Sequence, residues 1–167
     1  MIAVAFKHYT AEVDFLKSAE SWIFSKQLGS DFVHAELVFL DYGVGFSAWS
    51  DSGVTFKPLY NRISNINGWE FYELKPRNVD KLWDWCISQK GKAYDKKAIL
   101  GLVNNKNQHD TTKWFCSEIA YYAITMIDHQ DFPLVQPHKV FPGDLRTMCI
   151  QANLKQIYPS YDSLRMV

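Results

Sequence analysis

Apolar and polar residues alternate along several short stretches in the first half of the chain, as they do in β-strands that bury one face. The predicted strands are residues 2–6, 32–40, 44–49, 54–57 and 69–74. The polar sequence Asp41-Tyr42-Gly43 separates the second strand from the third. It is rich in turn-forming residues and therefore predicts an antiparallel pair.

A longer period, with apolar residues three or four positions apart, predicts helices elsewhere in the chain. They are placed at residues 11–26, 78–88, 96–103, from about 116 to 127, and 143–156 with Asp144 as the cap of the last. The elements together make an α+β protein. No internal repeat, low-complexity tract or linker interrupts the chain, so residues 1–167 are expected to form a single domain.

Composition and charge narrow the class of protein. Apolar residues make up 47% of the 167, which favours a folded domain with a real core over a disordered chain. Eighteen basic residues balance eighteen acidic ones, so the net charge gives no reason to expect nucleic acid or an anionic membrane as a partner. Three scattered cysteines are too few for a disulfide framework and favour a reducing compartment.

The first residues of the chain bear on its expected location. The apolar residues 1–6 are followed at once by Lys7 and His8, so they lack the long apolar core of a signal peptide and are expected to be a strand. No segment approaches the length of a transmembrane span. A cytoplasmic location without a signal peptide or membrane segment is the resulting prediction.

Cys116 is the first candidate for chemistry. It lies where the polar stretch 104–113 gives way to a largely apolar run, and hence at or near a helix start. Unpaired N–H groups and the helix dipole favour a thiolate at such a position, which is one way that proteins make a cysteine nucleophile. The alternative is a buried cysteine that acts as a small hydrophobic residue, as most free cysteines do.

His34 supplies a candidate base for such a nucleophile. It lies near the start of the strand 32–40, where alternation places it on the same face as Glu36. A histidine at a strand start and a cysteine at a helix start form the smallest constellation of a cysteine hydrolase. His34-Ala35-Glu36 also matches half of the zinc deaminase signature, but the cysteine-pair half is absent. No metal or other cofactor is therefore expected.

Four short motifs occur in an order that resembles a known superfamily. They are His34-Ala-Glu-Leu-Val-Phe39, Ser47-Ala-Trp-Ser-Asp-Ser-Gly-Val-Thr-Phe-Lys57, Gly91-Lys-Ala-Tyr-Asp95 and Phe115-Cys-Ser-Glu118. With the histidine strand before the cysteine helix, the chain resembles the circularly permuted branch of the NlpC/P60 papain-like proteins. That branch includes YiiX-like proteins, small bacteriophage proteins and, more distantly, the lecithin:retinol acyltransferase-like enzymes. The resemblance implies a permuted papain-like α+β fold, with a small antiparallel sheet packed on the cysteine helix.

The resemblance also implies an activity and roles for five residues. It implies a cysteine peptidase- or amidase-type hydrolase, or an acyltransferase, that acts on an amide or ester through an acyl-enzyme. Cys116 is then the nucleophile and His34 the base, while Tyr94 and the N–H of Cys116 bind the oxyanion. The third catalytic residue stays open between Ser47, on the strand after the histidine, and Glu36.

Substrates in the superfamily include peptides, peptidoglycan peptides and lipids, and the sequence does not choose among them. The strand after the histidine strand carries Ser47, Trp49 and Ser50, but no His, Glu, Gln or Asn to act as the third catalytic residue, so a second interpretation stays open. In it the chain is a catalytically weak or inactive papain-fold binding protein. A phage protein that binds a host factor in the host cytoplasm is an example.

Overall fold

The computed structural model describes residues 1–9, 30–60, 68–103, 110–128 and 130–157, with the main chain alone at 100–103. The predicted helix 11–26 lies outside the described residues. Within them, the protein is α+β, with a six-stranded antiparallel sheet and four α-helices. No helix in this described part is long and apolar enough to span a membrane.

The strands follow the order β4-β3-β2-β1-β5-β6 across the sheet. Their bounds are β1 Ile2–His8, β2 Phe32–Phe39, β3 Val44–Trp49, β4 Gly53–Pro58, β5 Trp69–Leu74 and β6 Gln156–Ile157. The first five confirm the strands predicted from alternation. The short β6 was not predicted, since it pairs with β5 opposite Phe71 and Tyr72, which lie far away in the sequence.

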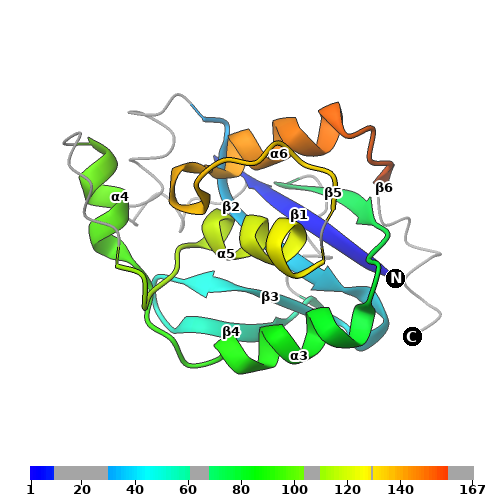
Figure 1. The fold of residues 1–167 in the computed structure, drawn as a ribbon, viewed down its shortest axis with the longest axis horizontal. Coiled ribbons are helices and arrows are strands. Elements are labelled where there is room, and N and C mark those ends of the chain that lie inside the picture. The colour runs from blue at the N-terminus through cyan, green and yellow to red at the C-terminus, as the bar shows by residue number, and fades with distance from the viewer. Residues whose placement is uncertain (10–29, 61–67, 104–109, 129, 158–167) are drawn as a thin grey trace.

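Three helices cover one face of the sheet, as Figure 1 shows. They are α3 Val79–Gln89, α5 Cys116–Tyr122 and α6 Pro142–Gln151, and the fourth helix, α4 Lys96–Val103, lies to one side. Leu82 of α3, Ile119 of α5 and Leu145 of α6 share one core with the sheet residues of this face, such as Leu37. The central position belongs to α5, which contacts both β2 and β3.

Two predictions about the last helix were wrong. It ends at Gln151 and not at residue 156, because Asn153 takes a left-handed conformation (φ 54°) that the helix cannot continue through. Asp144 is not the cap residue either. Phe141 holds that position, and Asp144 lies three residues later, where its carboxylate accepts the Phe141 N–H at 3.0 Å.

The opposite face of the sheet combines apolar and polar side chains. Its apolar cluster includes Ala5, Val38, Trp69 and Phe71. Lys7 of β1 lies opposite both His34 of β2 and Trp69 of β5, so these side chains share that face. Lys7, His34, Glu36 and Ser47 are all buried.

Candidate active site

The hydrogen-bond ladder between β2 and β3 ends inside the two strands. Their paired register runs from Phe39 opposite Val44 to Leu37 opposite Phe46. Beyond that point β3 keeps its pairing with β4 as far as Trp49, while β2 keeps its pairing with β1. A gap therefore opens between β2 and β3 beside Ala35, the residue two positions before Leu37.

Side chains of Ser47 and Cys116 lie where main-chain hydrogen bonds between Ala35 and β3 would otherwise form. The Ser47 hydroxyl donates to the Ala35 carbonyl at 2.8 Å, and the Ala35 N–H lies close enough to the Cys116 sulfur to lower the pKa of its thiol. Both polar main-chain groups of a strand residue point to the same side, so both Ala35 groups face the gap. Cys116 thus lies where the main chain of β3 would continue the ladder.

The chain that leads into Cys116 is held by main-chain and carboxylate contacts. The Trp114 N–H donates to the Ala93 carbonyl at 3.2 Å, and the Trp114 carbonyl accepts the Asp95 N–H at 2.9 Å. Glu118, in the first turn of α5, accepts the Phe115 N–H at 3.2 Å. These contacts fix the residues immediately before the helix, and with them the position of the thiol.

Asp95 is a buried residue of this region whose role the sequence analysis missed. Its carboxylate accepts the Ala98 N–H at the start of α4 and the Asp110 N–H, both at 2.9 Å. It therefore joins α4 to the segment that leads into Cys116. The available signal was an aspartate one residue before a predicted helix, which is a strong cap pattern.

Burial dominates the electrostatics of Cys116. Its side chain is 1% exposed, and burial raises the pKa of the thiol to about 11 although N–H groups of Ala35, Ser117 and Cys116 itself lower it. The helix start therefore does not produce the lowered pKa that its position predicts. Burial raises the pKa of the Cys86 and Cys149 thiols further still. Cys116 is thus a neutral thiol at pH 7, yet the most acidic of the three.

His34 is next to the residue whose N–H contacts Cys116. Its side chain leaves β2 on the face opposite to that of Ala35, and its ring lies 4.2 Å from the Trp49 ring and edge-on to Trp69 at 6.2 Å. The main chain of Ala35 thus lies next to both His34 and the Cys116 sulfur.

The two candidates for the third catalytic residue are directed at other groups. The Glu36 carboxylate lies over Gly45, where an added Cβ would come within 2.3 Å of an oxygen. Gly45 is opposite Val38, about 13 Å along β2 from the level of His34. Glu36 thus leans away from His34, and the Ser47 hydroxyl donates to the main chain of Ala35.

Tyr94, the predicted oxyanion donor, is held near the cysteine segment by its main chain. It forms an isolated parallel bridge with Trp114, two residues before Cys116. Its half-buried ring packs against the main core and against a smaller cluster that includes Phe115 and Val33. The structure thus brings Tyr94, Cys116, Ser47 and the main chain next to His34 into one region.

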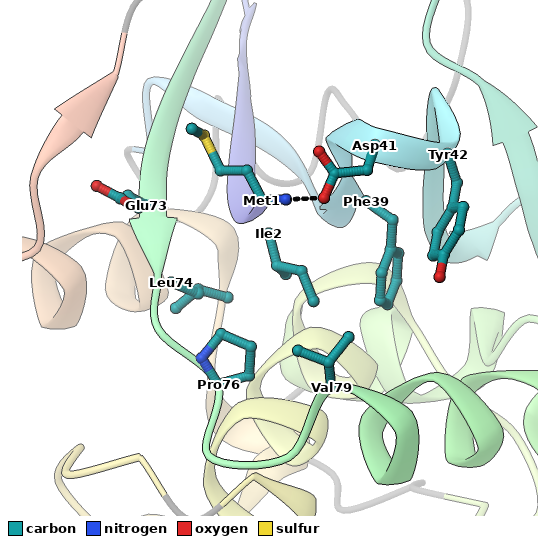
Figure 2. Close-up of a pocket in the computed structure, with 9 residues that line it drawn as sticks. All are labelled: Met1, Ile2, Phe39, Asp41, Tyr42, Glu73, Leu74, Pro76 and Val79. Carbon is teal, nitrogen blue, oxygen red and sulfur yellow. Dashed lines mark hydrogen bonds and ion pairs between the residues drawn. The ribbon is translucent and has the colours of Figure 1, made fainter. Parts of the chain in front are cut away.

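A pocket of about 260 Å³ lies at the other end of the sheet (Figure 2). Ile2, Phe39, Leu74 and Val79 form its apolar lining, and the terminal amine of Met1 pairs with the Asp41 carboxylate at its edge. Phe39 ends β2, whereas Ala35 lies in its first half, so this pocket is separate from the Cys116 region. Nowhere in the described ranges do three potential ligands gather in a group that could hold a metal ion.

No protein-family model matches the chain, and no curated protein matches its sequence.

Proposed function

We propose that the protein is a thiol-dependent hydrolase or acyltransferase of the permuted papain-like kind, with Cys116 as nucleophile and His34 as base. One observation carries the proposal. The Cys116 sulfur lies in the gap between β2 and β3 against the N–H of Ala35, the residue that follows His34. The sulfur therefore lies next to the strand position that carries His34, as a nucleophile that uses this histidine requires.

The proposed reaction proceeds through an acyl-enzyme. His34 takes the thiol proton as the Cys116 sulfur attacks the carbonyl carbon of an amide or ester, and the carbonyl oxygen becomes an oxyanion. The N–H of Cys116 and the Tyr94 hydroxyl are the proposed donors to that oxyanion. Collapse of the intermediate breaks the bond to the leaving group, which receives the proton from His34. Water or an acceptor then attacks the thioester and releases the acyl group.

The raised pKa of Cys116 determines when the thiol loses its proton relative to attack on the substrate. Because burial raises the thiol pKa to about 11, the resting site holds a neutral thiol beside a histidine and not a thiolate–imidazolium pair. Proton transfer to His34 then accompanies attack on the substrate. The site must also open, since only 1% of the Cys116 side chain is exposed.

Acylation of the protein by an activated ester tests the proposal. A variant with Cys86→Ala and Cys149→Ala is incubated with 4-nitrophenyl acetate, and its intact mass is followed with time. We expect one acetyl group on Cys116 and continued release of nitrophenol. Cys116→Ala in the same background should abolish both, and His34→Ala should slow acylation at least a hundredfold, the usual range of a general base. A folded protein that never carries the acetyl group, or that reacts equally fast without His34, contradicts the proposal.

The burial of Cys116 favours a second candidate, an inactive papain-fold binding protein. In that case Cys116 is a small core residue, and the protein acts by binding a host protein. Cys116→Ala should then leave partner binding intact. The acylation experiment separates the two functions, because a binding protein gives no acetyl adduct that depends on both Cys116 and His34.

A further inference from the structure

Ser47 and Cys116 occupy the gap between β2 and β3 in a complementary way. The Ser47 hydroxyl donates to the carbonyl of Ala35, and the Cys116 sulfur lies near the N–H of the same residue. Ser47 is fully buried and its main chain stays paired with Thr55 of β4. A β3 main chain that continued the ladder would use both Ala35 groups and leave no place for the sulfur.

We propose that Ser47 is a positioning residue that keeps this gap open, so that the main-chain N–H of Ala35 is a dedicated hydrogen-bond donor to the Cys116 thiolate. This inference deepens the proposed function and rests on it for its purpose, because the N–H would stabilise the negative charge that develops on the sulfur when Cys116 attacks. It gives Ser47 a role different from that of orienting the imidazole of His34.

The chemistry of the hydroxyl supports this assignment. A serine hydroxyl has one hydrogen, and that of Ser47 is donated to the Ala35 carbonyl at 2.8 Å. Because the Ser47 hydroxyl satisfies the Ala35 carbonyl, this part of β2 needs no hydrogen bond from the main chain of β3. The adjacent N–H then points at the sulfur from a main chain that β1 holds rigidly on its other edge. Hydrogen bonds to a charged acceptor in a buried site are about twice as strong as neutral ones.

Removal of the single N–H tests the proposal most directly. An α-hydroxy acid in place of Ala35 converts the amide to an ester, which keeps the methyl side chain and deletes the donor. The thiolate fraction of Cys116 is read from its rate of alkylation by iodoacetamide at a fixed pH of about 8, followed by intact mass in the Cys86→Ala, Cys149→Ala background. We expect this rate to fall about ten- to a hundredfold, which corresponds to a rise of about one to two units in the thiol pKa on loss of one hydrogen bond to a charged group.

A second ester provides the matched control. At Leu37 the ester removes an N–H on the same edge of β2, in the last rung opposite Phe46, without touching Cys116. It should destabilise the protein and leave the thiol pKa unchanged. Equal shifts from both esters, or no shift from the ester at residue 35, overturn the proposal.

Substitution of Ser47 tests the positioning role. Ser47→Ala should raise the thiol pKa in the same direction as the ester, and Ser47→Thr, which restores a hydroxyl, should return it toward the wild-type value. If Ser47→Ala folds and leaves the thiol pKa unchanged, Ser47 does not position the N–H. The readout is independent of turnover, so a protein with these shifts but no acetyl adduct retains this inference about the gap and loses the proposed hydrolase function.

Discussion

At the scale of single residues, Glu118 has an environment that makes stability depend on pH. It is 1% exposed in the first turn of α5, and burial raises the pKa of its carboxyl to about 8, with a further rise from nearby Asp95. The hydrogen bond from the Phe115 N–H acts in the opposite direction without overcoming burial. The side chain therefore keeps its proton at pH 7 in the folded protein and loses it in the unfolded chain.

This difference predicts a fall in stability as the pH rises. The folded-state pKa lies above the unfolded value of 4.5, so the contribution is complete below pH 4.5 and is lost as the pH approaches 8. Glu118→Gln removes the titration and should flatten the free energy of unfolding between pH 5 and 8, by on the order of a few kcal/mol. Urea unfolding at several pH values measures the effect.

Asp144 provides the matched control for that experiment. It occupies the same third position of α6 and accepts the Phe141 N–H, but its side chain is exposed. Asp144→Asn should therefore leave the pH dependence in this range nearly as it is in the wild type. A Glu118→Gln protein whose stability still falls steeply from pH 5 to 8 would show that another group titrates.

At the scale of the elements, β2 and β3 fit together through one glycine. A Cβ at Gly45 would lie 2.3 Å from one Glu36 oxygen and 2.7 Å from the carboxyl carbon, closer than any real contact. Gly45→Ala should destabilise the protein by about 1–3 kcal/mol through overpacking. Glu36→Ala removes the clash, so the double variant should be more stable than the sum of the two single changes predicts. Urea unfolding of the four proteins gives the coupling energy.

Gly43 separates this steric effect from the general effect of losing a glycine. It lies in the connection before β3 with φ 62°, and nothing lies within 4 Å of an added Cβ. Gly43→Ala should cost stability through its backbone conformation alone. That cost should be the same with and without Glu36, whereas the cost at Gly45 should not.

Local patterns in the sequence account for most of the fold. Alternation predicted β3 and β5 to the residue, although each of these strands buries residues on both of its faces. The end of α6 was misplaced because Asn153 and the pairing of Gln156 with β5 depend on tertiary contacts. The permuted papain-like arrangement stays a prediction, since the observed sheet and helices establish only the α+β class.

The candidate site was predicted less completely than the fold, because the gap between β2 and β3 depends on a residue that is distant in the sequence. Cys116, His34 and Ser47 were chosen from their residue types and their places on predicted elements. Nothing in the alternation of β2 or β3 marks the end of their ladder at Leu37, because both strands keep their period beyond it. The residue that fills the gap comes from a helix 81 positions after Ala35, so only the three-dimensional structure reveals the interruption.

At the scale of the whole molecule, one ionic cluster ties the helical layer to the sheet beside this site. Arg146 of α6 donates to both carboxylate oxygens of Glu70 on β5, at 2.6 and 3.2 Å. Its guanidinium also lies 4.7 Å above the ring of Phe32, which opens β2. His8 of β1 contacts the same carboxylate at 3.1 Å, so the cluster joins three strands to one helix.

The cluster predicts a pH-dependent contribution that a lysine cannot replace. Burial raises the pKa of Glu70, but hydrogen bonds from Arg146 and Tyr72 outweigh it and leave the pKa below its usual 4.5. The stabilisation is therefore complete above pH 4.5 and is lost as the pH falls through the lowered folded value. Arg146→Lys gives up the two-point contact and should cost about 1–2 kcal/mol at pH 7 in urea unfolding. Below the lowered pKa of Glu70 the difference from the wild type should shrink.

The control for this prediction is a pair on the surface. Lys113→Met removes a cation from the Lys113–Asp110 surface pair and should change stability little at pH 7 or in acid. If Arg146→Lys costs no more at pH 7 than Lys113→Met does, the cluster does not hold α6 on the sheet, and the packing of Leu145 and Cys149 in the core does so instead.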